Sequence, residues 1–401
     1  MARTVRVATV QLTPAEVGSP RTNFAAIRAL LASHGGGSAG NGFQCDLLVL
    51  PEMIATGWYR FEHAAAIHPL CESASASASA SASETLVLGA ELAVELNAYV
   101  VVGFAERCDS QGEAHIQTGY PVSQPFDARD PDLVSSAIED DAQASAATVR
   151  YYNSAALFDR SGQLIHVFRK HFLYEDDKTW AQEGPGFQYV DLPDIGRLCV
   201  GICMDLNRAH LPLLAAYRFS SSQLPFYTDR ADSSHSFCGT AYDFEAPFGA
   251  FELATFCANN GVDILALPTA WLLSPSENSE GPAQEESLKS NTTAAPSMQT
   301  IKYWALRCSP LCADINDDAD APERASSGRK RRAFLVAANR TGTERGVTFA
   351  GSSAILQFDP ASSAAQEGGA NNAKAAPVVK LLAALGTQQQ GAQVVPIQLE
   401  R

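Results

Sequence analysis

Three chemically reactive side chains each follow a short apolar run of the kind that forms a buried strand. They are Cys203 in RLCVGIC, Glu52 in LLVLPE and Lys170 in LIHVFRK. A thiolate can attack a carbonyl carbon, a carboxylate can act as a general base, and an ammonium can stabilise an oxyanion. If the three strand ends meet in a single crevice, they form a thiol-dependent hydrolytic site.

Each of these residues also has an ordinary structural explanation. Free cysteines are usually buried, acids after strands are often solvated, and basic pairs usually lie at the surface. A cysteine–histidine dyad is another alternative, with His171 as its candidate. Because neighbouring strand residues face opposite sides of a sheet, His171 is expected to point away from the side that Lys170 faces. By the same rule Cys199 shares a face with Cys203, which indicates a packed neighbour rather than a second nucleophile.

The composition bounds the class of protein and its partners. With 401 residues, 46% of them hydrophobic, the chain can bury a large core. It has 29 basic and 44 acidic residues, and the resulting formal charge of −15 disfavours binding to a phosphate backbone. The sequence shows neither a secretory signal pattern at its start nor an apolar run long enough to cross a bilayer. We therefore expect a cytoplasmic protein, with access to the nucleus open, that binds neither nucleic acid nor membrane.

Motifs for metals and cofactors are not found in the sequence. The nine cysteines are odd in number, scattered and without a CxxC pair, which argues against both a disulfide framework and a structural zinc site. Neither a GxGxxG or Walker pattern nor an HExxH motif is present. The sequence thus predicts chemistry that requires no metal and no cofactor.

Taken in order, the three reactive residues and their surroundings resemble the nitrilase or carbon–nitrogen hydrolase superfamily. The resemblance covers nearly the whole chain. It is carried by RVATVQLTP (6–14), LLVLPEMIATGW (47–58), VVGFAER (101–107), YNSAALFDRSGQLIHVFRKHFL (152–173), the cysteine strand, GVDILALPTAW (261–271) and FLVAANRTGTERGVTFAGSSAILQFDP (334–360).

Strand-like runs alternate with helical patterns at 23–34 and 84–97, which indicates a layered α/β architecture. The family resemblance implies a four-layer αββα sandwich. We expect one domain spanning residues 1–401, interrupted by flexible surface insertions whose composition lacks the bulk and periodicity of a core. The expected insertions are 72–84, 109–148, 208–240, 274–297, 314–329 and 361–376.

The resemblance also implies roles for the reactive residues. Cys203 would be the nucleophile and Glu52 the general base. Lys170 and the backbone amide of Met204 would stabilise the tetrahedral oxyanion. Glu106, in a supporting role, would hold Lys170 charged and oriented.

The segments GICMDLN, FGAFELATFCANN (248–260) and LPTAWL look like those of the fungal-type protein N-terminal amidases. This subgroup removes the side-chain amide of N-terminal asparagine or glutamine, giving the acid and ammonia through a cysteine thioester, in an N-degron pathway. The substrate would be the N-terminus of a protein or peptide, whose free α-ammonium needs a buried or half-buried carboxylate. The favoured carboxylate is Glu252, the other candidates are Asp205, Asp177 and Glu245, and the expected pocket walls are Trp58 and Trp271.

Two other functions stay open at this point. The same triad serves a small-molecule amidase, nitrilase or carbamoylase. An inactive member kept as a binding scaffold is disfavoured, because Glu52, Lys170 and Cys203 are all present. The sequence does not distinguish a monomer from a homodimer.

Overall fold

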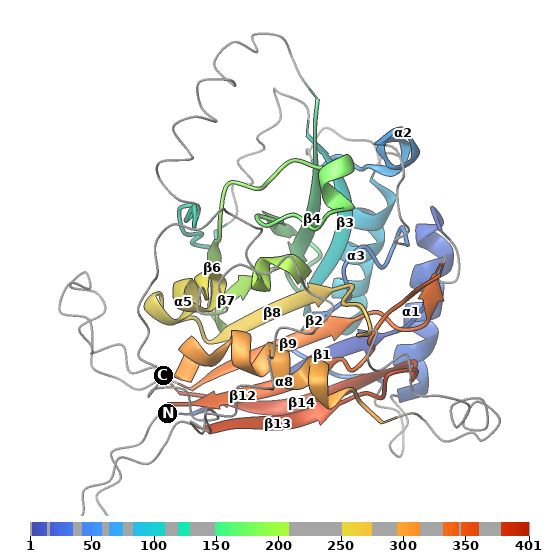
Figure 1. Ribbon diagram of the computed structural model, residues 1–401. Helices are drawn as coiled ribbons and strands as arrows, with labels where there is room; N and C mark the ends of the chain where they lie inside the picture. Colours follow the sequence, from blue (N-terminus) through green and yellow to red (C-terminus); the bar gives the residue numbers. More distant parts are fainter. Residues whose placement is uncertain are drawn as a thin grey trace, which may run out of the picture.

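Two mixed β-sheets face each other and carry helices on their outer sides (Figure 1). The expected α/β fold of the αββα type is therefore confirmed. The computed structural model describes residues 2–13, 17–34, 42–57, 64–74, 83–108, 119–128, 149–207, 251–274, 295–312, 332–344, 346–360 and 378–400.

The first sheet has the strand order β14-β1-β2-β3-β4-β5. Its inner strands β1, β2 and β3 run parallel, and the remaining pairs are antiparallel. The parallel strands end on the same edge, which is where the segment with Glu52 leaves the sheet. Its strands are β1 (Arg3–Gln11), β2 (Leu47–Val49), β3 (Tyr99–Cys108), β4 (Arg150–Phe158), β5 (Leu164–Arg169) and β14 (Gly391–Leu399).

The second sheet has the order β13-β12-β9-β8-β7-β6, with β7, β8 and β9 parallel at its centre. Its strands are β6 (Tyr189–Leu192), β7 (Gly196–Val200), β8 (Ile264–Thr269), β9 (Ala333–Asn339), β12 (Ala354–Asp359) and β13 (Val378–Ala384). The shorter elements are α2 (Ala64–Ile67), η1 (His68–Leu70), η3 (Asp177–Thr179), η4 (Cys203–Leu206), η6 (Ser309–Cys312), β10 (Thr343–Glu344) and β11 (Val347–Thr348).

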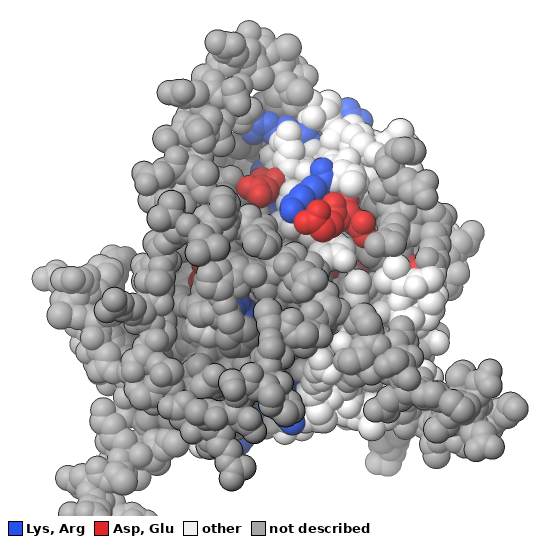
Figure 2. Space-filling view, in the orientation of Figure 1, with Lys and Arg blue, Asp and Glu red and all other residues white. Residues whose placement is uncertain are grey.

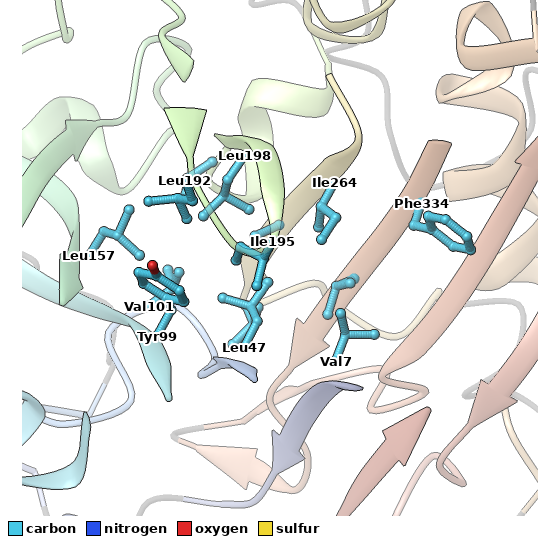
Figure 3. Packing of buried hydrophobic residues seen from close by; sticks show 14 of the residues in the cluster. Val7, Leu47, Tyr99, Val101, Leu157, Leu192, Ile195, Leu198, Ile264 and Phe334 are labelled. Atoms are coloured by element: carbon cyan, nitrogen blue, oxygen red, sulfur yellow. The ribbon is translucent and has the colours of Figure 1, made fainter. Parts of the chain in front are cut away.

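The alternation of side chains along each strand builds the layers. In β1, Val5 and Val7 belong to the core between the sheets, whereas Ala8 and Val10 pack on the helical side. Figure 3 shows side chains of both sheets meeting in the central core, for example Leu47 beside Ile195. The two sheets therefore share one apolar layer, and their positions are fixed relative to each other.

In the described part of the chain, four longer helices cover the outer faces. Helices α1 (Pro20–His34) and α3 (Glu84–Leu96) pack on the first sheet, and α5 (Glu252–Asn259) and α8 (Met298–Arg307) pack on the second (Figure 1). The helices expected at 23–34 and 84–97 are confirmed. Helix α1 starts three residues earlier than expected, at a proline, which is compatible with a first helical turn.

Parts of three expected insertions belong to the ordered fold, and this corrects the sequence interpretation. Within 274–297, Ser274 is buried, and the side chain of Ser297 caps α8 by accepting from the amide of Thr300. Glu72 is buried, and its carboxylate accepts hydrogen bonds from the first amides of α3. Within 109–148, residues 119–128 hydrogen bond along β6 through Ser123 and Phe126. The insertions expected at 208–240, 314–329 and 361–376 lie outside the described residues, as do 75–82, 109–118, 129–148 and 275–294.

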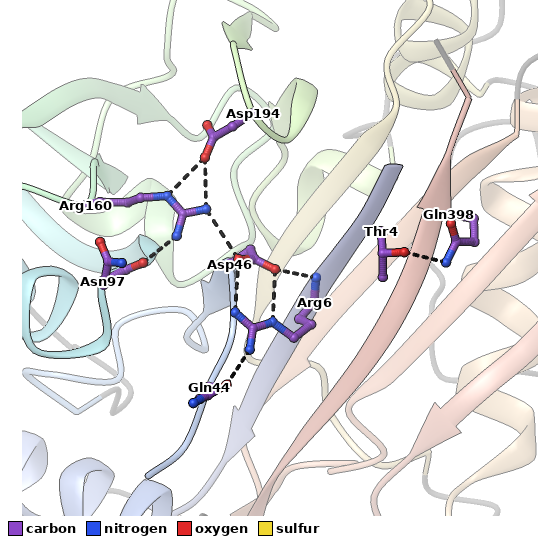
Figure 4. Close-up of polar contacts among 8 residues, drawn as sticks. All are labelled: Thr4, Arg6, Gln44, Asp46, Asn97, Arg160, Asp194 and Gln398. Atoms are coloured by element: carbon purple, nitrogen blue, oxygen red, sulfur yellow. Dashed lines mark hydrogen bonds and ion pairs between the residues drawn. The ribbon is translucent and has the colours of Figure 1, made fainter. Parts of the chain in front are cut away.

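A charged network closes the sheet edge opposite to Glu52. Asp46 accepts hydrogen bonds from the backbone and side chain of Arg6, and Arg160 bridges Asp46 to Asp194 (Figure 4). Asp46 precedes β2 and Asp194 lies between β6 and β7, so the network connects the two sheets. Burial raises the pKa of Asp46, but the bonds from Arg6 and the charge of Arg160 outweigh it, and that pKa lies below its usual value.

The surface mixes charges of both signs. Near the middle of the face drawn in Figure 2, acidic side chains gather beside a basic one. Ion pairs also join α1 to α3, because Arg28 contacts both Glu91 and Glu95.

None of the described helices combines the length and the apolarity that a membrane span requires.

Candidate active site

Glu52 lies in a tight turn that begins two residues after β2 ends. The turn packs on β3 at Gly103, where an added Cβ would lie only 2.7 Å from the backbone nitrogen of Met53 and 3.1 Å from the Cα of Glu52. Met53 has a φ of 52°, which a side-chain-bearing residue rarely adopts. Glycine at position 103 therefore permits the close approach that carries the Glu52 carboxylate to the carboxyl end of the sheet.

The structure brings Lys170 directly onto the Glu52 carboxylate. Lys170 follows β5, is 2% exposed, and its Nζ donates to Glu52 Oε1 at 2.8 Å and to Asp177 Oδ2 at 2.6 Å. Burial lowers the pKa of Lys170, but the negative charges of Asp177 and Glu52 outweigh it, so that pKa lies well above the usual value. Lys170 is therefore a permanent ammonium, and an ammonium has three N–H donors. The two carboxylates take two of them.

Asp177, the first residue of η3, is the second acid at this ammonium. It is buried, and besides Lys170 it accepts hydrogen bonds from the backbone amide of Tyr174 and the side chain of Asn153. Its oxygens are thus engaged within the protein. The expectation that Asp177 could receive a substrate α-ammonium is not supported by this geometry, since it already neutralises Lys170.

The expectation that Glu106 holds Lys170 is wrong. The Glu106 carboxylate forms a two-point ion pair with Arg169, at 2.9 and 2.7 Å, and accepts a hydrogen bond from Ser154. Ser154 is paired with Arg169, whereas Lys170 donates its backbone amide to Asn153. Since side chains alternate along β4, Ser154 and Asn153 face opposite sides. Glu106 therefore belongs to a separate cluster behind the sheet.

Cys203 lies at the end of the β7 segment, in the first residue of η4. Its φ of 46° puts a non-glycine residue in the left-handed region, a strained conformation of the kind that turns holding reactive side chains adopt. Gly201 allows the close packing of this turn against α5, because an added Cβ there would lie 2.5 Å from a methyl of Leu253. The sulfur is close enough to Glu52 and Lys170 for both charges to change its pKa.

The Cys203 thiol is protonated at rest. Burial and the negative charge of Glu52 raise its pKa to about 12, although Lys170, Thr269 and the backbone amide of Ala270 lower it. At neutral pH the sulfur therefore needs a base at the moment of attack. Glu52 is the carboxylate whose charge raises the pKa of the Cys203 thiol, so it is the candidate for that base.

Asp205 holds the turn that carries the cysteine. Its carboxylate accepts hydrogen bonds from the backbone amides of His171, Phe172 and Ile202, each at 2.8 Å. Burial raises the pKa of Asp205 to about 6, and these amides counteract the shift. Asp205 therefore ties the cysteine turn to the segment after Lys170, and a role in binding an α-ammonium is not supported.

Met204 contributes its backbone rather than its side chain. The side chain is buried in the core on the outer face of the second sheet. Its backbone amide lies in the first turn of η4, where amides have no acceptor within the helix. This position suits the expected oxyanion donor.

The remaining substrate-binding candidates are placed as follows. Glu252 is the first residue of α5, is partly buried, and lies 4.0 Å from Arg307. Trp271 is 4% exposed and packs against Tyr303 and Trp304, with Cys203 at the margin of the same apolar cluster. The candidates Trp58 and Glu245 lie outside the described residues.

The dyad alternative receives no support from the geometry. The buried ring of His171 contacts the Gly184 carbonyl through Nδ1 at 2.9 Å and lies 3.2 Å from Asp127 on its other side. It thus faces away from Lys170, as strand alternation predicts. Cys199 is a fully buried neighbour of Cys257 in the outer core.

Asn153 is a site residue that sequence reasoning missed. It lies fully buried on β4, and its Nδ2 donates to both Glu52 Oε1 at 2.8 Å and Asp177 Oδ1 at 3.0 Å. A polar pair, Asn153 and Ser154, interrupts the otherwise apolar strand YYNSAALF. Since buried polar groups require partners, this interruption was the available signal.

The described residues also bear on metal binding. Within the described stretches, no group of three or more histidine, cysteine, aspartate or glutamate side chains is arranged to hold a metal ion. The cluster of Glu52, Asp177 and Lys170 is instead organised around an ammonium.

Comparisons with known proteins show which families and folds this chain resembles. The carbon–nitrogen hydrolase family model matches residues 6–123. The chain is 26% identical over 361 residues to the protein N-terminal amidase of Schizosaccharomyces pombe, a match that covers 87% of this chain and 90% of the relative. It is also similar to solved structures of an N-terminal amidase with an Asn-Glu peptide (TM-score 0.61, 19% identity) and with a Gln-Gly peptide (TM-score 0.60, 18% identity), each covering 99% of this chain and 98% of the other. At these identities the structural likeness concerns the fold.

Proposed function

We propose that this chain, a member of the carbon–nitrogen hydrolase family, removes the side-chain amide from N-terminal asparagine or glutamine of proteins and peptides. The products are the corresponding N-terminal acid and ammonia. The observation that carries the proposal is the buried cluster in which Lys170 bonds Glu52 and Asp177 beside the Cys203 thiol.

In the first half-reaction Cys203 attacks the carbon of the side-chain carboxamide. The S–C bond forms as the thiol proton passes to Glu52, and the carbonyl oxygen becomes an oxyanion. The remaining N–H of Lys170 and the backbone amide of Met204 stabilise that charge. Glu52 then gives the proton to the amide nitrogen, the C–N bond breaks, and ammonia leaves a thioester on the enzyme.

In the second half-reaction water hydrolyses the thioester. Glu52 takes one proton from the water as its oxygen bonds to the acyl carbon, and the same two donors stabilise the second oxyanion. The C–S bond then breaks, and the proton returns to sulfur. The free carboxylic acid leaves and the Cys203 thiol is restored. The cycle balances without a metal, a cofactor or a redox step.

The choice of substrate rests on the relatives. The similar curated relative is named protein N-terminal amidase, and similar solved structures contain Asn-Glu and Gln-Gly peptides. For the α-ammonium we propose Glu252. Its neighbour in the chain, Leu253, contacts Gly201 on the cysteine turn, and Glu252 itself remains partly exposed. Trp58 and Trp271 are the proposed pocket walls.

The proposal extends to the setting of the reaction. The product carries an acid where an amide was, so the enzyme would act in an N-degron pathway. We propose that residues 1–401 form one catalytic domain and that the protein acts in the cytoplasm with access to the nucleus. The described cysteines are all free thiols, which agrees with a reducing compartment.

The test compares four substrates: a short peptide beginning with asparagine, its glutamine counterpart, the N-acetylated asparagine peptide and free asparagine. Ammonia release and a mass gain of about one unit on the free-amine peptides support the proposal, because a site built for an ammonium rejects the acetylated form. Equal turnover of the acetylated peptide contradicts it. Turnover of free asparagine alone supports a small-molecule amidase instead. Cys203→Ala is the control for background hydrolysis.

The role of Glu252 has a separate test. Glu252→Gln should raise KM for free-amine peptides and leave the thermal stability of the protein nearly unchanged. An unchanged KM transfers the role to a carboxylate outside the described residues, for which Glu245 is the remaining candidate.

A further inference from the structure

One neutral amide connects both acids of the active site. Asn153 is paired with Ala105 in the first sheet, and its side chain is fully buried. Its Nδ2 donates one hydrogen bond to Glu52 and one to Asp177. A primary amide nitrogen has two hydrogens, so both are used. The orientation of the amide is unambiguous, because carboxylate oxygens accept and only the nitrogen can donate to them.

The charges of this cluster do not cancel. Glu52 and Asp177 contribute two negative charges and Lys170 contributes one positive charge, all three side chains being 2% exposed. The buried guanidinium of Arg340 also interacts with Glu52, but its own ion pair is with Glu344. A buried excess charge is costly unless hydrogen-bond donors stabilise it. Asp177 has a backbone amide for this purpose, that of Tyr174. Among the described residues, the neutral group that donates a hydrogen bond to the Glu52 carboxylate is the side-chain amide of Asn153.

The same contacts distinguish the two oxygens of Glu52. Oε1 accepts from both Lys170 and Asn153, at 2.8 Å each. In the described part of the chain no donor is bonded to Oε2. An oxygen held by an ammonium and an amide is a poor proton acceptor, so proton transfer falls to Oε2.

We propose that Asn153 is a positioning residue that keeps Glu52 and Asp177 ionised together and leaves Oε2 of Glu52 as the atom that moves protons. The inference deepens the proposed function, on which its kinetic test rests. The backbone of Asn153 has a separate task, because its carbonyl accepts from the Lys170 amide, and a side-chain substitution leaves that bond in place.

The kinetic test uses Asn153→Leu and Asn153→Ser. Leucine removes both donors at similar volume, and serine retains at most one. The acid limb of kcat/KM should move to higher pH by about one unit or more in Asn153→Leu, since a lost hydrogen bond to a charged group disfavours the ionised form. Asn153→Ser should shift it less. The loss at pH 7, about 10-fold or more, should fall on kcat rather than KM.

Ser154→Ala is the matched control. It removes a buried hydrogen bond from the next residue of the same strand, but the bond leads to Glu106 on the other face. A merely structural role for Asn153 predicts that both substitutions lower stability and that neither moves the acid limb.

A second measurement needs no substrate. In an infrared titration downward from pH 8, Asn153→Leu should show a protonated carboxyl about one pH unit earlier than the unchanged protein, and this difference should disappear when Glu52→Gln or Asp177→Asn is added. An unshifted acid limb, or a titration without that difference, overturns the inference. If the unchanged protein fails to deamidate any asparagine or glutamine peptide, the proposed function fails, and the infrared result still decides the role of Asn153.

Discussion

Replacing Lys170 by methionine should destabilise the protein in a manner that depends on pH. Methionine keeps most of the volume of the lysine stem, so the change is mainly the loss of the ammonium. That ammonium donates to Glu52 at 2.8 Å and to Asp177 at 2.6 Å, and all three groups are buried. Removing one partner of such a cluster costs about 3–5 kcal/mol, because the other charges are left uncompensated.

The sign of the pH dependence follows from the same contacts. In the unchanged protein the pKa of Lys170 is raised, and this shift stabilises the folded state. The stabilisation is fully present at pH values below about 10.4, the usual pKa of lysine, and is lost as the pH rises through the pKa of Lys170 in the folded state. It is therefore constant between pH 5 and pH 7. In Lys170→Met the two buried carboxylates lose the ammonium that bonds both of them, while the nearby Arg340 remains paired with Glu344, so one carboxylate binds a proton that the unfolded chain does not. The variant should regain about 1.4 kcal/mol per pH unit on acidification toward pH 5.

The assay is urea unfolding at pH 7, 6 and 5, followed by circular dichroism. Lys178→Met is the matched control, because Lys178 pairs with Glu175 at 2.8 Å at the exposed surface and its loss should lie within the error of the method. A Lys170→Met penalty below about 1 kcal/mol, or one that is equal at all three pH values, would show that the Lys170 ammonium does not neutralise the two buried carboxylates.

Three further predictions concern the surroundings of the site and the fold. Gly103→Ala should lower kcat/KM about 100-fold, because the added Cβ would lie 2.7 Å from the Met53 nitrogen and the turn with Glu52 must shift. Steady-state kinetics tests this on a variant whose secondary structure is unchanged, and near-normal activity would show that the turn adapts freely. Glu52→Gln should abolish turnover. It should also speed alkylation of Cys203 by iodoacetamide at pH 9, because the Glu52 charge, together with burial, raises the pKa of the thiol. Slower alkylation than in the unchanged protein contradicts this. Asp46→Asn should lower the free energy of unfolding by about 1 kcal/mol at pH 7. The difference should begin to decrease near pH 4 and vanish as the pH falls through the depressed pKa of Asp46, whereas a difference that persists at pH 2 assigns the effect to packing.

Local sequence patterns predict a layered α/β fold and the residues that lie at strand ends, whereas the αββα arrangement and the meeting of the three strand ends are implied by the family resemblance. Apolar runs and alternation determine which segments become buried strands, and a residue just past such a strand emerges at the sheet edge. Alternation alone predicts that His171 points away from Lys170, as observed, whereas the 2.8 Å contact between Glu52 and Lys170 depends on how the strands are ordered in the sheet.

The partners of Lys170 depend on geometry that periodicity does not contain. Asp177 reaches the ammonium because the chain turns back after β5 into η3, and nothing in the spacing determines the direction of that turn. The Glu106 error has a simpler origin. Alternation places the adjacent Arg169 and Lys170 on opposite faces, and Glu106 shares its face with Arg169.

The most direct test of the central claim is intact-protein mass spectrometry of the enzyme quenched during turnover of an asparagine-initiated peptide. The thioester mechanism predicts a covalent adduct with the mass of the peptide less ammonia, located on Cys203 by fragmentation and missing in Cys203→Ala. An adduct on another residue, or full turnover by Cys203→Ala, would contradict it.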